Sequence, residues 1–241
     1  MTTTHIESLT TSQQPKTSET AWKLLYRIGG VVAYIMIALV VVAIVVFLVD
    51  PSPTTVIGYF QLFQKSILMG LLALDLVYMV SQILMGLLLL AVCVALRRAN
   101  PSLIAIALAA GLVAVAVFLT SNPAFGMLSL SSHYAAATSA VQRAQLEAAG
   151  QAIMANFTGT AYVVSYILGS IAVLIISAVM LRSKVFSKGT AVVGLIMGIM
   201  GLVLASFGTV GLILAFGSLV PTVIWLFLIA RRLLQLGQNR S

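Results

Sequence analysis

Residues 28–49 read IGGVVAYIMIALVVVAIVVFLV, and this stretch predicts that the chain enters a membrane. It is 22 residues long, carries no charged side chain and contains 15 Val, Ile, Leu or Phe residues. As a helix rising about 1.5 Å per residue it would be roughly 33 Å long, enough to cross a hydrocarbon core of about 30 Å. Its apolar side chains would favour insertion by about 5–9 kcal/mol, at roughly 0.3–0.6 kcal/mol each.

The composition of the whole chain agrees with this interpretation. Apolar residues make up 61% and charged residues 7% of the sequence, whereas about 25% of an average soluble domain is charged. We therefore expect an all-α fold, a polytopic membrane helix bundle with six transmembrane helices, over residues 22–236. The expected spans are residues 28–49, 76–96, 102–119, 159–181, 189–207 and 210–230. Residues 1–21 and 237–241 are expected to be cytoplasmic tails, the first of them disordered.

The distribution of basic residues orients these spans. Of 13 Lys and Arg residues, 11 fall on the side of the first tail, and only Lys65 and Arg143 fall on the other. Because Lys and Arg collect on the cytoplasmic side, both termini are expected in the cytoplasm, in a bacterial cytoplasmic membrane. The basic residues lie at the ends of apolar segments rather than along one face, so we expect them to contact the lipid bilayer and not nucleic acid.

The longest polar region, residues 120–158, predicts an external amphipathic helical cap. Ser139 and Gln142 have the spacing of a capping box, and an Ala-rich helix can follow to about Asn156. Leu146 and Ile153 share one face of that helix. We expect the helix to lie over the outer mouth of the bundle, where it could contact a protein or lipid partner.

Asp75 is the only acidic residue within an apolar segment. It shares a helix face with Tyr78 and Gln82, and a membrane carboxylate is a functional hypothesis by default. Counting back from Arg97, however, places it about 33 Å away, near the outer boundary. Two interpretations therefore remain open for Asp75, a structural role as an interfacial or capping residue and a contact with an ion, a proton or a ligand.

A second polar stripe falls in the fourth expected span. Tyr162 and Tyr166 lie one turn apart there, and Gly169 follows on an adjoining ridge of small residues. The two tyrosines are either interfacial packing residues or part of a pocket lining. Gly169 is expected to allow close helix packing.

The fifth expected span carries Gly194, Gly198 and Gly201. The first two form a G-x-x-x-G pattern, which lets two helix backbones approach closely. This face is interpreted as packing within the chain, with a homodimer interface as the alternative. In the sixth span, Pro221 predicts a kink, which is either static or a hinge.

No pattern in the sequence predicts catalysis, a cofactor or a metal. There is no G-x-S-x-G elbow and no H-E-x-x-H motif, and the two histidines, His5 and His133, lie on opposite sides of the expected membrane. The single cysteine, Cys93, excludes an intrachain disulfide. We therefore expect that the protein is not an enzyme.

Several short stretches resemble a bacterial family of multi-pass membrane proteins catalogued as domain of unknown function 4386. They are SNPAF at 121–125, MLSLS at 127–131, YAAAT at 134–138, AAG at 148–150, VSY at 164–166, MLRSK at 180–184, FSK at 186–188 and IARRL at 229–233. The resemblance covers roughly residues 75–236. It implies a bacterial inner-membrane protein with about six helices, and it brings no assigned activity or catalytic residues.

These observations favour a non-enzymatic integral membrane protein with a structural, lipid-binding or partner-binding role. The alternative is a small transporter or channel that uses the polar stripe around Asp75, Tyr78 and Gln82. The two hypotheses differ in whether Asp75 faces a wet cavity or the outer headgroups.

Overall fold

The computed structural model describes residues 17–49, 52–203 and 208–238. These residues form helices joined by short connections and contain no strand, which confirms the expected all-α class. The helices are α1 Thr17–Val49, α2 Val56–Lys65, α3 Ile67–Ala73, α4 Leu76–Leu96, α5 Pro101–Ser121, α6 Ala124–Ala136, α7 Ala140–Phe157, α8 Thr160–Arg182, α9 Lys188–Leu202, α10 Gly208–Gly217 and α11 Leu219–Gln238. Five apolar helical stretches, built on α1, α4, α5, α8 and α11, are long enough to cross a membrane, and α9 is a shorter apolar helix.

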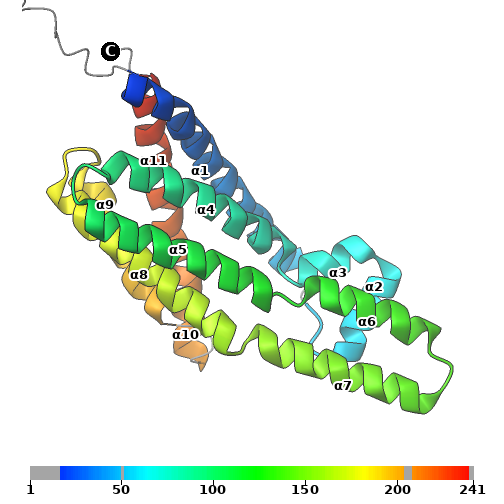
Figure 1. Cartoon of the computed structure of the whole chain (residues 1–241). Coiled ribbons are helices and arrows are strands. Elements are labelled where there is room, and N and C mark those ends of the chain that lie inside the picture. The colour runs from blue at the N-terminus through cyan, green and yellow to red at the C-terminus, as the bar shows by residue number, and fades with distance from the viewer. Residues whose placement is uncertain (1–16, 50–51, 204–207, 239–241) are drawn as a thin grey trace, which may run out of the picture.

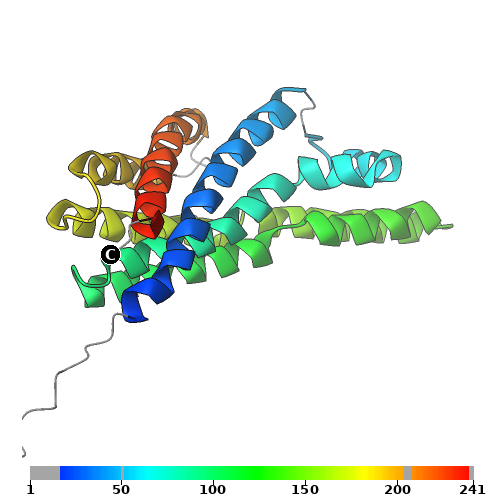
Figure 2. The ribbon, with the colours of Figure 1, turned by 90° about the horizontal axis from the view of Figure 1, so that it is seen from above.

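Six of these helices pack in a closed ring. In order round the ring they are α1, α4, α5, α8, α9 and α11, and α11 packs against α1 to close it. Figures 1 and 2 show α1, α4, α5 and α8 side by side, with α9 and α11 behind them. The ring surrounds the main hydrophobic core.

The second, third and fourth expected spans agree closely with α4, α5 and α8. Local sequence explains where α5 begins. Pro101 occupies its first turn, where no backbone donor is needed, and the Asn100 side chain accepts a hydrogen bond from the Leu103 amide at 3.1 Å.

The first and last helices extend beyond their expected limits. α1 begins at Thr17, so residues 17–21 are helical and not part of a disordered tail. α11 continues to Gln238, where Arg27 Nε donates to the Gly237 carbonyl at 3.0 Å. Packing of the two helices against each other thus continues past the apolar stretches that define the spans. The rest of the expected tails, residues 1–16 and 239–241, lies outside the described residues.

The last two expected spans differ most from the sequence prediction. α9 ends at Leu202, and residues 204–207, expected to complete the fifth span, lie outside the described residues. The sixth expected span is divided into α10 and α11 at Ser218. The Ser218 and Thr222 amides still bond to the Leu214 and Ser218 carbonyls, at 2.8 and 3.0 Å, so the helical hydrogen bonding is interrupted only locally. Pro221, in the first turn of α11, has no amide to donate to the Gly217 carbonyl, which agrees with the interruption expected from this proline.

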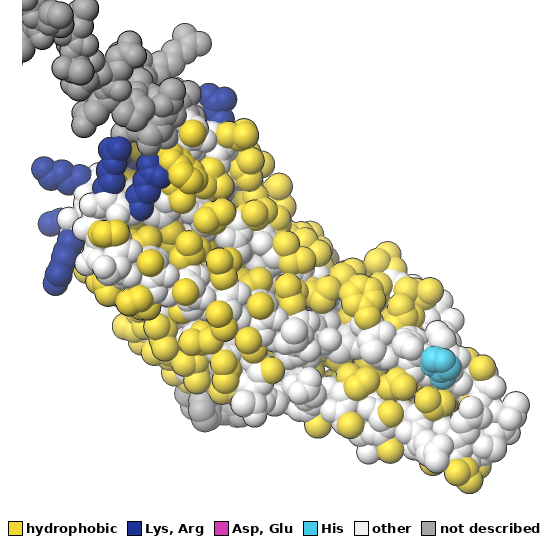
Figure 3. Space-filling model, in the orientation of Figure 1, with side chains coloured by type: hydrophobic (Ala, Val, Ile, Leu, Met, Phe, Trp, Pro, Cys, Tyr) yellow, Lys and Arg dark blue, Asp and Glu magenta, His cyan; other side chains and the backbone are white. Residues whose placement is uncertain are grey.

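Basic residues gather at one end of the ring, which we call the basic end (Figure 3). Three guanidinium groups link different segments there. Arg27 of α1 bonds to the end of α11, Arg97 lies over the Trp22 ring at 4.8 Å, and Arg232 donates to the carbonyl of Val185 between α8 and α9. The start of α1, the α4–α5 and α8–α9 connections and the end of α11 are therefore neighbours.

At the opposite end, α2, α3, α6 and α7 form what we call the projecting module. It has its own small core, which includes Phe60, Phe63 and Met127. Ser139 is the N-terminal capping residue of α7, as its spacing to Gln142 predicted, because its Oγ accepts a hydrogen bond from the Gln142 amide at 3.1 Å. Helix α6, which the sequence analysis did not predict, pairs with α7.

The direction of α7 corrects a sequence expectation. The helix does not lie over the mouth of the bundle; α6 and α7 continue the lines of α5 and α8 and project from the ring (Figures 1 and 2). Gly150 is the residue of α7 that is buried, against Val56 and Phe60 of α2. Packing against α2 and α6 thus replaces packing on the bundle.

Candidate functional site

The two polar stripes predicted from sequence meet inside the ring. A column of aromatic rings joins Phe157 to Tyr162 (centroids 6.1 Å apart), Tyr162 to Tyr166 (4.6 Å), Tyr166 to Tyr78 (6.4 Å) and Tyr78 to Phe118 (4.9 Å). The rings come from the end of α7 and from α8, α4 and α5. Edge-to-face and offset ring pairs of this kind hold helices in a fixed relative position.

Tyr78 and Tyr166 line a cavity of about 180 Å³. Its walls come from α4, α5, α8, α9 and the α10–α11 junction. The polar lining residues are Tyr78, Gln82, Ser165, Tyr166, Ser170, Ser218 and Thr222, and the apolar ones are Met85, Leu89, Gly111, Ala114, Val115, Phe118, Gly169, Val173, Met197, Gly198 and Gly201. No charged side chain is among them.

The cavity lies in the half of the ring nearest the projecting module. Its lining residues on α4 and α8 fall in the halves of those helices that adjoin the module. The other half of the ring is filled by buried apolar side chains, among them Leu96, Met180, Trp225 and Leu233. The cavity is therefore closed toward the basic end.

Backbone hydrogen bonds fix the orientation of two hydroxyls in the lining. Ser165 Oγ donates to the Tyr162 carbonyl at 2.6 Å, and Thr222 Oγ1 donates to the Ser218 carbonyl at 2.7 Å. A hydroxyl has one hydrogen to donate and two lone pairs that accept. With their hydrogens already used, these two groups can only accept hydrogen bonds from a molecule in the cavity.

Close packing of α8, α9 and α11 forms the side of the cavity toward the basic end. A Cβ atom at Gly194 would meet Trp225 Nε1 at 2.6 Å and would overlap Ser177 Oγ. One at Gly198 would meet Leu174 Cγ at 2.7 Å, and one at Gly201 would meet Ser170 Oγ at 2.6 Å. Gly194, Gly198 and Gly201 thus face other helices of the same chain.

Asp75 lies at the junction of α3 and α4, one turn before Tyr78, and does not line the cavity. Its backbone is left-handed, with φ of 63°, and its side chain does not cap α4. Among the described residues Asp75 has no ion-pair partner. The adjacent Leu74 carbonyl accepts a hydrogen bond from Asn122 Nδ2 at 3.1 Å, which ties this junction to the start of α6.

The surroundings of Asp75 shift the pKa values of two side chains, Asp75 itself and Tyr59. Protein atoms around it raise the pKa of the carboxyl above its ordinary value of 3.8 by desolvation, although part of the residue is exposed. Burial also raises the pKa of Tyr59 in α2, and the negative charge of Asp75 adds to that shift.

The structure thus brings together four of the five candidate contact residues. Tyr78, Gln82 and Tyr166 line the cavity, Tyr162 packs on Tyr166, and Asp75 lies just beyond them. Gly169 lines the cavity, and a Cβ there would meet only Ala114, at 3.8 Å. Sequence analysis did not identify Phe118, Ser165 and Ser170, and only the polarity of the two serines within an apolar span marks them.

The fold and site together define an all-helical protein with several membrane-length apolar helices and an internal aromatic cavity. No protein-family model, curated protein or solved structure matches the chain. The function must therefore be inferred from the site itself.

Proposed function

We propose that the chain is a six-span protein of the bacterial cytoplasmic membrane with both termini in the cytoplasm. In this arrangement α9 is the fifth span, and α10 with α11 is the sixth. The basic end supports the orientation, because Lys and Arg collect at the cytoplasmic ends of membrane helices. The projecting module then lies outside. Membership of the family called domain of unknown function 4386 remains part of the proposal, and rests on the motifs of residues 121–233.

We further propose that the protein binds a small ligand in the cavity and does not transform it. The observation that carries this proposal is the convergence of Tyr78, Gln82 and Tyr166 on one cavity of about 180 Å³. An engineered protein cavity of about 150 Å³ binds benzene, so a ligand of about that size fits. No carboxylate and no histidine lines the cavity, because Asp75 lies outside the lining.

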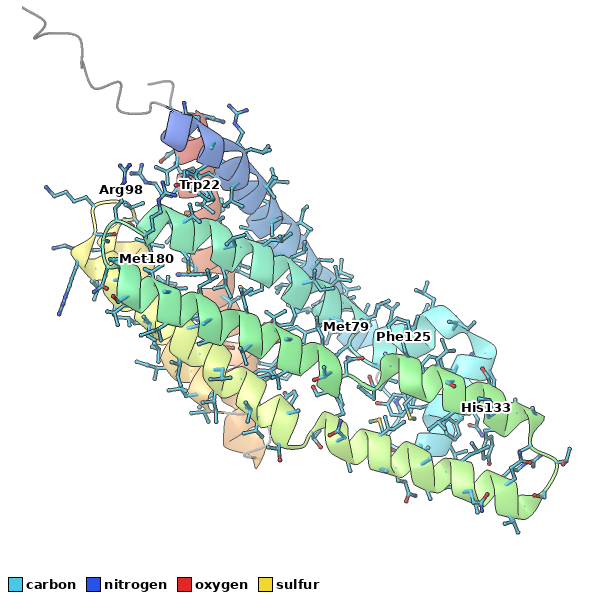
Figure 4. All side chains as sticks on the ribbon, viewed as in Figure 1. Trp22, Met79, Arg98, Phe125, His133 and Met180 are labelled. Carbon is cyan, nitrogen blue, oxygen red and sulfur yellow. The ribbon has the colours of Figure 1, made fainter. Side chains whose placement is uncertain are left out.

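The absence of a paired acid and base near the cavity supports a binding role over catalysis. General acid–base catalysis needs both groups within hydrogen-bonding reach of the reacting atoms. His133 is exposed near the far end of the projecting module (Figure 4), where its Nδ1 bonds to the Ser129 carbonyl at 2.9 Å. Asp75 lies at the other end of that module, beside α4.

Transport is the second candidate function. It is favoured by the interruption between α10 and α11, because Ser218 at the break and Thr222 one turn later both line the cavity. Broken membrane helices commonly form substrate sites in transporters. For a substrate to pass from the cavity to the basic end, the core around Met180 and Trp225 would have to open.

A pair of glycine variants tests the binding function. In Gly169→Leu the new side chain would enter the cavity, whereas in Gly86→Leu it would lie on α4 away from the lining, and a Cβ at either position meets nothing closer than 3.7 Å. The full chain, purified in detergent, would be heated with a panel of ions, amines, alcohols and small aromatic molecules. A ligand at about 100 times its Kd stabilises the fold by about 2.7 kcal/mol.

We expect at least one molecule of the panel to stabilise the wild type and Gly86→Leu but not Gly169→Leu. Stabilisation of all three proteins by the same molecule would place its site elsewhere. A panel without effect on the wild type would contradict the binding function.

A further inference from the structure

We propose that the ligand of this cavity is a small organic cation, such as a methylated ammonium, held at the tyrosine-lined end with its charge facing Asp75. This inference rests on the proposed binding function and specifies its ligand class. It follows from three features of the site, namely an unpaired carboxylate near the cavity, aromatic side chains in its lining and fixed hydrogen-bond acceptors.

The first feature is the carboxylate. Asp75 has no basic partner within the described residues, and it precedes the first turn of α4, which carries Tyr78. Because Tyr78 lines the cavity one helical turn away, the negative potential of Asp75 extends to that end of the cavity. A carboxylate in a partly desolvated place is stabilised by a nearby positive charge.

The second feature is the set of ring faces. Tyr78 and Tyr166 both line the cavity, and their rings are nearly parallel, with 24° between the planes. Phe118, at 88° to Tyr78, adds a third aromatic wall. The face of an aromatic ring attracts a cation within about 6 Å of its centroid, and cages of such rings recognise quaternary ammonium groups.

The third feature is the hydrogen-bonding character of the lining. Ser165 and Thr222 have given their hydrogens to backbone carbonyls, so they present lone pairs to the cavity. No Lys or Arg lines it, and the basic groups of the ring gather at the other end. An anion would therefore meet no positive charge in the lining, whereas an ammonium group would meet lone pairs and aromatic rings.

The test compares choline with its neutral carbon isostere, neohexyl alcohol, in which carbon replaces the quaternary nitrogen. Binding of each to the purified full chain would be measured by calorimetry on the wild type, Asp75→Asn and Glu147→Gln. Asn tolerates the left-handed backbone of Asp75. Glu147→Gln removes the same charge from α7, away from the cavity, as a matched control. Asp75→Gly is a second variant without the carboxylate, for use if Asp75→Asn fails to fold, because glycine readily adopts a left-handed backbone.

We expect choline to bind the wild type and Glu147→Gln equally, and to bind both Asp75 variants at least about ten-fold more weakly. The alcohol should bind the wild type at least about ten-fold more weakly than choline. If the alcohol binds as tightly as choline and Asp75→Asn changes neither, the cation proposal is overturned and the cavity function stands. If neither probe binds while another molecule of the panel does, the cation proposal alone falls. If no molecule binds, both proposals fall.

Discussion

Tyr78 of α4 and Tyr166 of α8 stack across the inside of the ring, with centroids 6.4 Å apart, although α5 lies between their helices in the order of packing. Phe118 of α5 meets Tyr78 edge-on and closes the space behind the pair. These contacts set the distance between α4 and α8 at the cavity. The tyrosines therefore shape the cavity as well as line it.

Removal of the Tyr166 ring should weaken the fold more than removal of its hydroxyl. Tyr166 contacts the rings of both Tyr162 and Tyr78, and an aromatic pair is worth about 0.5–1.5 kcal/mol. We expect Tyr166→Leu to be about 1–3 kcal/mol less stable than Tyr166→Phe in denaturant titrations of the detergent-solubilised protein. Equal stability of the two variants would show that the ring column does not hold the helices.

Two glycines of α9 should respond oppositely to a methyl group. Gly194→Ala would force a Cβ against Ser177 and Trp225, so α8, α9 and α11 must separate, at a cost of about 1–3 kcal/mol. Gly189→Ala in the first turn of the same helix meets only Ser187 Oγ, at 3.7 Å, and should gain up to about 1 kcal/mol. Thermal unfolding of both variants provides the check, and a neutral Gly194→Ala would be inconsistent with this packing.

Asp75 should make the stability of the folded protein depend on pH. Because the folded state raises the pKa of this carboxyl above 3.8, it binds the proton more tightly than the unfolded state does. Relative to Asp75→Asn, the wild type should therefore gain stability as the pH falls from above the raised pKa toward 3.8, and lose it as the pH rises. The phenols near Asp75 ordinarily ionise only near pH 10 and do not interfere. Parallel pH profiles of the two proteins would refute the assignment.

Single cysteines can test the proposed orientation. A cysteine for labelling must be exposed. In α6, Ser132 is exposed and suits this purpose, whereas its neighbour Ser131 is buried and donates to the Phe60 carbonyl at 2.9 Å. With Cys93 replaced by Ala, an impermeant thiol reagent should label Ser132→Cys in intact cells and should label Lys184→Cys only after lysis. The reverse pattern would invert the topology.

Much of the fold could be predicted from local sequence. The apolar runs ended by Arg97 and Arg182 gave the limits of α4, α5 and α8 closely, because length and charge alone decide which residues a membrane accepts. The capping spacing of Ser139 and Gln142 likewise located the start of α7. Such signals depend on neighbours in the sequence and need no tertiary information.

The features of the fold and site that the sequence did not predict, or predicted wrongly, depend on contacts between residues far apart in the chain. Periodicity assigned Tyr78 and Tyr166 to faces of their own helices but could not show that the faces meet. Helix α7 packs against α2 and α6 instead of lying over the bundle. The last turn of α11 depends on Arg27, far away in the sequence.

The binding of a small molecule in the cavity can be observed directly through methionine methyl groups. Met85 and Met197 line the cavity, whereas Met127 lies in the core of the projecting module and Met180 in the core near the basic end. In protein labelled with carbon-13 at the methionine methyls, choline or its neutral isostere should shift the signals of Met85 and Met197 and leave those of Met127 and Met180 in place. Signals of Met85 and Met197 that stay unchanged at saturating concentrations of both probes would contradict the account.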